Sequence, residues 1–287
     1  MPPPSRPYPA IPPIPPIPPP PPSPAPGSAA TLRVFLADLH LDGQDTPRAR
    51  AFRALLGRLS SEAARRPVEL YVLGDLFEFW DEYHRAAMEG YEADLAALEA
   101  AHTSGVRINL LWGNRDFMLG PRAQRRFGAR LLGDGARVRI GDSRWLWLEH
   151  GDLLCTADRR YLYFLRPLVR SWPVRLAYRL LPWRIARRVV MWLAARSRAE
   201  CDVKAPETFA PDAEAARKRL ESAACQVLLC GHTHRAQAAD LGGGLRLLAL
   251  PPWRDTQEGY REQAGALTPI RVQEDGTPAP AAGAEAE

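Results

Sequence analysis

Short apolar runs alternate along this chain with longer segments whose apolar residues recur at helical spacing. Each run has the length and composition of a buried strand. The runs lie at residues 32–37, 68–73, 106–112 and 226–230, with helical spacing over 47–66 and 84–102. Because alternating strands and helices build a largely parallel sheet with helices on its faces, the sequence predicts an α/β fold.

Three further segments extend this pattern. Residues 137–148 alternate polar and apolar side chains, as a half-buried hairpin does. Residues 245–250 and 268–272 are apolar again and are expected to form closing strands. With 46% hydrophobic residues among 287, the chain can build the core of one large domain. It has no run of about 18 apolar residues, so the sequence predicts no membrane-spanning helix.

The two ends of the chain differ in composition from the part between them. Sixteen of the 29 prolines fall at or before Pro26, so residues 1–30 are expected to form an extended, disordered tail. This tail is either a ligand for a proline-binding domain or a dispensable extension. Residues 276–287 are rich in Ala, Pro and Gly and are expected to form a loose C-terminal tail. The domain is therefore expected to span residues 31–275.

Cysteine usage favours a reducing compartment. The chain has four cysteines, none of them in a CxxC pair, and a domain of this length does not need disulfides for stability. A cytoplasmic protein with free thiols is the expectation.

Residues that can bind metal follow directly after the apolar runs. They are Asp38, His40, Asp75, Asn114, His150, His232 and His234. Ligands collect beyond the carboxyl ends of parallel strands, so we expect these side chains to converge. Two divalent ions a few ångströms apart need about that many oxygen and nitrogen donors, with one carboxylate shared. The set therefore indicates a dinuclear metallohydrolase. Taken singly, Asp38 and Asp75 could instead cap helices or form turns, and Asn114 could occupy a left-handed turn.

The order of these motifs, D-x-H, GD, GN, HGD and GHTH, resembles that of the calcineurin-like metallophosphoesterases over residues 32–250. The resemblance implies two packed β-sheets flanked by helices. Within that superfamily, five longer motifs resemble those of the UDP-2,3-diacylglucosamine hydrolases of lipid A synthesis. These motifs lie at residues 37–41, 74–78, 113–120, 150–156 and 231–235.

The resemblance also implies how the metal ligands divide between two Mn²⁺ ions. One ion would be held by Asp38, His40 and His234. The other would be held by Asn114, His150 and His232, and Asp75 would bridge the two.

The residue after Asn114 bears on the type of reaction. Many members of the superfamily carry a histidine there, which can protonate a departing alkoxide, whereas this chain has Arg115. A guanidinium does not release its proton near neutral pH, so it can only bind and neutralise phosphate oxygens. A phosphate leaving group, with a second pKa of about 6, needs no proton. Arg115 therefore favours cleavage of a pyrophosphate, unless it only pairs with Asp116 or Glu78.

A basic segment from Arg159 to Arg198 holds eleven arginines and no acidic residue, interleaved with tryptophan, tyrosine and leucine. Arginine and tryptophan on amphipathic helices are typical of elements that lie on a membrane surface. Nucleic-acid binding also uses such charge, but the density of large apolar residues argues against it. The resemblance implies a helical cap inserted at about residues 157–222, which holds the acyl chains and rests on the inner membrane.

Positions in and near this insertion match substrate-contacting residues of the resembling enzymes. They are Asp158, Ser197 and Lys204. Cys201 stands where an asparagine is usual, and residues 251–253, Pro-Pro-Trp, also depart from the usual sequence. The Cys201 contact is therefore not carried over, and the match to those enzymes is weaker at the nucleotide end of the pocket.

The resemblance thus implies Mn²⁺-dependent hydrolysis of the pyrophosphate bond of UDP-2,3-diacylglucosamine, giving UMP and 2,3-diacylglucosamine 1-phosphate. Asn114, Arg115 and His232 would act on the reacting phosphate, at the cytoplasmic face of the inner membrane. Two alternatives stay open: hydrolysis of another nucleotide or lipid diphosphate, and a non-catalytic scaffold of the same fold. A scaffold would be expected to have lost metal ligands, and this chain has the full set.

Overall fold

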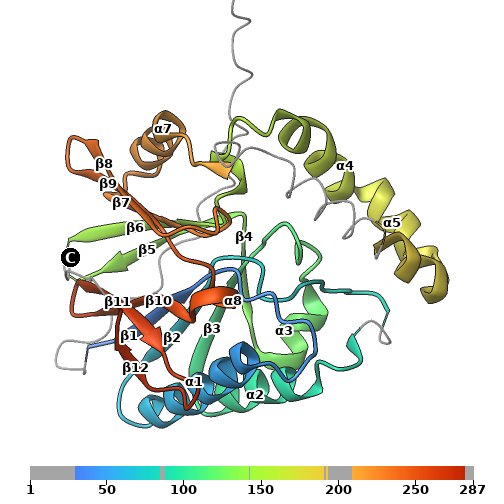
Figure 1. Cartoon of the computed structure of the whole chain (residues 1–287), viewed down its shortest axis with the longest axis horizontal. Coiled ribbons are helices and arrows are strands. Elements are labelled where there is room, and N and C mark those ends of the chain that lie inside the picture. Colours follow the sequence, from blue (N-terminus) through green and yellow to red (C-terminus); the bar gives the residue numbers. More distant parts are fainter. Residues whose placement is uncertain (1–29, 85–87, 142, 191, 193–208, 282–287) are drawn as a thin grey trace, which may run out of the picture.

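Two β-sheets packed face to face form the centre of the molecule, with helices on both outer faces (Figure 1). The computed structural model describes residues 30–84, 88–141, 143–190, 192 and 209–281. The expected α/β fold of two packed sheets flanked by helices is confirmed.

The first sheet has seven strands in the order β12-β11-β10-β1-β2-β3-β4. Strands β1 to β4 are parallel, and β10, β11 and β12 continue the sheet in antiparallel pairs. Their bounds are β1 Leu32–Leu36, β2 Val68–Val72, β3 Val106–Leu111, β4 Arg130–Gly133, β10 Glu258–Gln263, β11 Ala266–Val272 and β12 Pro278–Pro280.

The second sheet has five strands in the order β5-β6-β7-β9-β8. Strands β6, β7 and β9 are parallel to one another, and β5 and β8 pair antiparallel at the two edges. Their bounds are β5 Gly135–Ile140, β6 Arg144–Glu149, β7 Val227–Cys230, β8 Gln237–Gly242 and β9 Leu245–Ala249.

Apolar side chains fill three layers that follow from the strand pattern. Residues such as Phe35 and Leu229 pack between the two sheets. The outer face of the first sheet is covered by α1 (Pro47–Ala63), α2 (Glu92–Thr103) and α3 (Pro121–Phe127) (Figure 1). The outer face of the second sheet is covered by α7 (Ala213–Ala223). The strands of both sheets and these four helices thus bury their apolar faces in one body.

The first helix shows how local sequence sets an element. Thr46 caps α1, its hydroxyl accepting from the Ala49 amide at 3.3 Å, and Pro47 occupies the first helical turn. One face of the helix buries Phe52, Leu55, Leu56 and Leu59 on the first sheet. The helix therefore begins where the capping residue and proline predict.

The segment after β6 leaves the body of the molecule. It contains a short helical turn, η2 (Asp152–Leu154), a π-helical turn, η3 (Tyr161–Leu165), and the helices α4 (Arg166–Arg170) and α5 (Trp172–Leu180). In Figure 1, α4 and α5 extend to one side of the two sheets. We call residues 159–190 the helical insertion. Large apolar side chains are exposed on it, including Phe164 (74%), Trp172 (73%) and Leu180 (73%).

Three boundaries differ from those expected. The helix predicted from residue 84 begins only at Glu92, because Gly90 has a φ of +95° and breaks the helical path. The loose tail predicted from 276 is wrong at its start, because Pro278–Pro280 pairs with β11. The insertion predicted to reach 222 ends earlier, because α7 packs on the second sheet. Residues 1–29 and 282–287 lie outside the described part, so disorder at either end stays a prediction.

Several elements were not predicted from sequence: α3, β4, β8 and β10, and α8 (Trp253–Thr256). Among the described helices, none is both long and apolar enough to cross a bilayer.

Candidate metal centre

All seven predicted metal ligands lie at one edge of the two sheets, just beyond the carboxyl ends of parallel strands. Asp38 and His40 follow β1, Asp75 follows β2, and Asn114 follows β3. On the second sheet, His150 follows β6, while His232 and His234 follow β7. Because β1 to β3 and β6 to β7 are parallel neighbours, five loops meet at this edge.

The backbone of these loops is held in an unusual conformation. Among the described residues, eight other than glycine have a positive φ, and five of them are predicted ligands. The five are Asp38 (55°), His40 (47°), Asp75 (52°), His232 (66°) and His234 (52°). Such a conformation costs about 1 kcal/mol or more for each residue with a side chain, and it clusters at functional sites. The concentration of positive φ here marks the ligand loops as a functional site.

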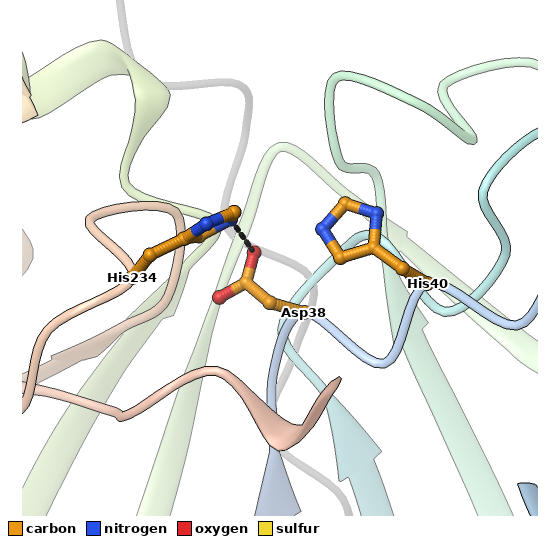
Figure 2. A group of neighbouring side chains, drawn as sticks. All are labelled: Asp38, His40 and His234. Atoms are coloured by element: carbon orange, nitrogen blue, oxygen red, sulfur yellow. Dashed lines mark ion pairs between the residues drawn. The ribbon is translucent and has the colours of Figure 1, made fainter. Parts of the chain in front are cut away.

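Asp38, His40 and His234 form one group of ligands (Figure 2). One ligand atom from each lies within 4.8 Å of the others. The Asp38 Oδ1 atom is 3.7 Å from Nε2 of His234. Its other carboxylate oxygen, Oδ2, accepts a hydrogen bond of 2.9 Å from the amide of His232. Asp38 is thereby fixed with one oxygen turned toward the two imidazoles.

Asp75 lies between this group and the second predicted group of ligands, which includes His150 and His232. Its Oδ2 atom is 3.7 Å from Nε2 of His40 and 3.7 Å from Nε2 of His150. Its Oδ1 atom accepts from the Arg115 amide at 2.8 Å, which fixes the carboxylate orientation. The same Nε2 atom of His150 is 3.2 Å from Nδ1 of His232. Asp75 therefore has the position that a bridging ligand needs.

Hydrogen bonds to the outer nitrogens set which imidazole nitrogens face the centre. Nδ1 of His150 donates to the carbonyl of Leu73 at 2.9 Å. Nδ1 of His40 donates to the carboxylate of Glu78 at 2.9 Å. In the neutral rings, the lone pairs of both Nε2 atoms are then directed toward Asp75. Carboxylates and carbonyls orient metal-binding histidines in this way.

Unpaired polar atoms test whether the residues fit a metal. Seven buried side-chain nitrogen or oxygen atoms of the described residues make no hydrogen bond. Three of them are Asp38 Oδ1, His40 Nε2 and Asn114 Oδ1, all predicted ligand atoms. Buried polar atoms are rarely left without a partner, so the three together call for a ligand that binds oxygen and nitrogen. The mixed carboxylate, amide and imidazole donors suit divalent transition ions such as Mn²⁺ or Zn²⁺.

Two glycines in the ligand loops leave no room for a side chain. A Cβ on Gly113 would lie 2.0 Å from Oδ1 of Asp75. A Cβ on Gly231 would lie 2.6 Å from Oδ2 of Asp38. Glycine at these two positions allows the backbone to approach the carboxylates closely.

Known proteins share this arrangement of motifs. The sequence model of the family described as calcineurin-like phosphoesterase matches residues 33–236. The chain belongs to the calcineurin-like phosphoesterase family.

Within this family, the chain is similar in sequence to proteins that share one enzyme name. A UDP-2,3-diacylglucosamine hydrolase from Ectopseudomonas mendocina (strain ymp) is 34% identical over 82% of this chain and 99% of that protein. A UDP-2,3-diacylglucosamine hydrolase from Azotobacter vinelandii (strain DJ / ATCC BAA-1303) is 35% identical over 83% and 98%. The likeness to solved structures is more distant. A dimetal phosphatase from Danio rerio is 12% identical with a TM-score of 0.45, over 86% of this chain and 97% of that chain.

Asp116, a buried aspartate, organises two ligand loops of this phosphoesterase. Its structural role was not predicted from the sequence. Asp116 accepts hydrogen bonds from the amides of Gly113 (2.9 Å) and Leu76 (2.8 Å), and longer ones from Asp75 and Phe77. Burial and the nearby charge of Asp75 raise the pKa of Asp116 to about 6. An aspartate after the Gly-Asn-Arg motif was the available signal, but sequence does not show that it binds four amides.

The ligand histidines have opposite charge preferences in the metal-free protein. Burial lowers the pKa of His150, but the carboxylates of Asp75 and Asp38 outweigh it and raise the pKa to about 9. For His232, burial together with the charge of His150 lowers the pKa to about 4. One imidazole of the adjacent pair is therefore protonated at neutral pH while the other is not. A metal ion that binds both must displace the proton from His150.

Arg115 lies at the same edge. Its guanidinium is 3.8 Å from Oε1 of Glu78, the carboxylate that also holds His40. Asp116, its other candidate partner, accepts from backbone amides. Arg115 thus lies near the predicted metal ligands and pairs loosely with Glu78, one of the two carboxylates named as alternative partners.

The remaining predicted site residues are placed less fully. Asp158 accepts from the amide of Tyr161 at 3.3 Å at the start of the insertion. Ser197, Lys204 and Cys201 lie outside the described residues, so their proposed contacts stay predictions. The departing Pro-Pro-Trp sequence has a structural use, because Trp253 is fully buried and its amide donates to the carbonyl of Ala37 at 3.0 Å.

Proposed function

We propose that this phosphoesterase hydrolyses the pyrophosphate bond of UDP-2,3-diacylglucosamine with Mn²⁺, releasing UMP and 2,3-diacylglucosamine 1-phosphate for lipid A synthesis. One observation carries this assignment. A centre built for two metal ions has Arg115, which cannot act as an acid, directly after the ligand Asn114. The relatives named UDP-2,3-diacylglucosamine hydrolase support the choice of substrate.

The roles of individual residues follow from their chemistry. Asp38, His40 and His234 would hold one ion, Asn114, His150 and His232 would hold the other, and Asp75 would bridge them. Bound divalent ions supply Lewis-acid activation of water and neutralisation of charge on phosphate. Asn114 and His232 would contact the phosphate as well as the metal. Asp116 holds the loops that carry Asp75 and Asn114 in register.

Arg115 would neutralise negative charge that builds on the phosphoryl oxygens during cleavage. Its backbone amide donates to Asp75, so the main chain of Arg115 is fixed beside the carboxylate that would bridge the two ions. The departing group, a sugar 1-phosphate, is stable without a proton because its second pKa is about 6. An alkoxide leaving group would need an acid that this position does not supply.

The helical insertion would hold the acyl chains and contact an anionic membrane surface. Its exposed Phe164, Trp172 and Leu180 are accompanied by the exposed arginines Arg184, Arg187 and Arg188. Cations beside large apolar side chains suit the interface of an anionic bilayer better than a nucleic acid. We propose that the protein works at the cytoplasmic face of the inner membrane, with Asp158, Ser197 and Lys204 contacting the substrate.

A substrate comparison tests the proposal. Purified protein with Mn²⁺ is assayed on UDP-2,3-diacylglucosamine, UDP-glucose and a nitrophenyl phosphodiester, and the products are identified by mass. We expect UMP and the lipid phosphate to form from the first substrate at a rate far above those of the other two. Faster cleavage of a different nucleotide or lipid diphosphate would favour the alternative within the family.

A further inference from the structure

Two arginines of the insertion point back to the body of the molecule. The Arg166 guanidinium is 2.9 Å from Oδ2 of Asp152 and 2.6 Å from Oδ1 of Asp134. Only 12% of the Arg166 side chain is exposed. The hydroxyl of Tyr161 donates to the same Asp152 oxygen at 2.9 Å. The first turns of the insertion are therefore fastened to the loop after β6.

Arg170 makes a second connection one helical turn further on. It forms an ion pair with Asp134, and its Nη2 atom donates to the carbonyl of Gly113 at 3.0 Å. Its guanidinium also faces the rings of Trp112 (5.9 Å) and Phe117 (5.5 Å), which flank the same loop. The Arg170 side chain is 15% exposed. This arginine is thus fastened to the loop after β3.

Each arginine pairs with Asp134, between β4 and β5, and also has one partner in a loop that carries a predicted metal ligand. Gly113 directly precedes Asn114, and its amide is already held by Asp116. Asp152 comes two residues after His150, across Gly151, whose φ is +110°. The pKa of Asp152 is lowered, since the charges of Arg166 and His150 outweigh the effect of burial. The loops that carry Asn114 and His150 therefore contact both the body of the molecule and an arginine of the insertion.

We propose that Arg166 and Arg170 are positioning residues that order the Asn114 and His150 loops, so that the second metal ion binds tightly only when the insertion is docked on the body. The two residues touch neither metal nor substrate. They act through the Gly113 carbonyl and the Asp152 carboxylate. The inference rests on the two-metal centre of the proposed function, but not on its substrate.

The geometry separates these two arginines from three others of the basic segment, Arg184, Arg187 and Arg188. Arg184, Arg187 and Arg188 are exposed, whereas Arg166 and Arg170 are largely covered and have carboxylate partners. An arginine that faces a membrane would not be directed into the loops of a metal centre. The charge of Arg166 and Arg170 is balanced locally by Asp134 and Asp152, so little of it is left for a lipid surface.

Metal binding to the purified, full-length protein tests the proposal without any substrate. The variants are Arg170→Ala and Arg170→Lys. A lysine can pair with Asp134 or donate to the Gly113 carbonyl, but its single ammonium cannot reproduce the planar fork that does both. The matched control is Arg58→Ala, because Arg58 also pairs with an aspartate (Asp275, 3.0 Å) and donates to a backbone carbonyl (3.1 Å), far along the chain from the centre.

Metal-free protein is titrated with Mn²⁺ by calorimetry, and the electron paramagnetic resonance spectrum is recorded at two equivalents. Wild type and Arg58→Ala should bind two ions and give the spectrum of a coupled pair. In both Arg170 variants the second ion should bind roughly 10- to 100-fold more weakly, as for other losses of outer-shell support. Their spectra should then show isolated Mn²⁺.

Two results would overturn the proposal. Two tightly bound, coupled ions in the Arg170 variants would overturn the proposal. If Arg170→Ala does not fold, Arg170→Lys decides the question, because the lysine keeps the charge beside Asp134. Should wild type itself bind a single ion, the two-metal centre of the proposed function would fail, and the inference with it. Two coupled ions in wild type and in the Arg170 variants alike would instead contradict only the positioning role and leave the two-metal centre intact.

Discussion

At the level of single residues, Asp75 contacts both predicted groups of metal ligands. One carboxylate oxygen faces an imidazole from each ligand group, and the other oxygen is held by a backbone amide. Burial raises the pKa of Asp75, but the charges of His150 and His40 outweigh it, so the pKa is lowered. The side chain is therefore ionised before any metal ion arrives.

Removing this carboxylate should affect both ions. Asp75→Ala should lower turnover by several orders of magnitude and release metal from both positions, because a shared ligand is lost. His40→Ala should disturb one ion and leave more activity. Metal content by mass spectrometry and initial rates in excess Mn²⁺ check this. Near-native activity of Asp75→Ala at saturating Mn²⁺ would contradict the dinuclear centre.

Arg115 allows a test of the leaving group. Arg115→Ala should strongly reduce cleavage of the pyrophosphate substrate, since charge neutralisation is lost. Arg115→His should not restore that reaction, but it should raise hydrolysis of esters with alkoxide leaving groups, because an imidazole can protonate them. The measurement is a pH–rate profile for wild type and both variants on each substrate class. Full rescue of pyrophosphate cleavage by histidine would show that proton donation matters there.

Protonation of His150 should compete with metal binding. Its raised pKa of about 9 keeps the ring charged at neutral pH in the metal-free protein. Mn²⁺ must displace that proton, so apparent affinity should rise as pH increases toward 9, by up to about tenfold per unit for one proton. The same shift stabilises the metal-free fold below the unfolded pKa of about 6.5, and that contribution is lost as pH rises through 9. Calorimetry in buffers of different ionisation enthalpy counts the released protons, and a pH-independent affinity would contradict this assignment.

At the level of elements, the helical insertion carries two sets of arginines that sequence does not separate. Its composition indicated a single basic, amphipathic stretch. The structure instead directs Arg166 and Arg170 to the ligand loops and leaves Arg184, Arg187 and Arg188 exposed. Only contacts with residues distant in sequence, such as Asp134 and Asp152, distinguish the two sets.

This distinction makes a prediction for membrane binding. Replacing Arg184, Arg187 and Arg188 together by glutamine should reduce sedimentation with anionic vesicles and leave metal content unchanged. Each lost cation near such a surface removes about 1 kcal/mol of attraction. The comparison variant is Arg126→Gln, because Arg126 is exposed on α3 and lies outside the insertion. Binding that is insensitive both to the triple substitution and to salt would argue against an electrostatic contact.

At the scale of the whole molecule, sequence predicted the parts that depend on local pattern. The strands that end at Asp38, Asp75 and Asn114 were recognisable because each is a short apolar run, and parallel strands bring their ends together. The antiparallel extension of the first sheet by β10 and β12 was not predicted, because β10 mixes polar and apolar residues and β12 is only the three residues Pro-Ala-Pro. The four amide contacts of Asp116 were missed for a related reason. They depend on loop conformations that no periodicity encodes.

In the proposed reaction, water attacks the phosphorus of the UMP half of UDP-2,3-diacylglucosamine. The direct measurement is the reaction with Mn²⁺ in ¹⁸O-labelled water, with both products analysed by mass spectrometry. We expect UMP to carry the label, the sugar 1-phosphate to carry none, and Asp75→Ala to form neither product at a comparable rate. Label in the sugar phosphate, release of UDP in place of UMP, or no cleavage by metal-loaded wild type would contradict the proposed reaction.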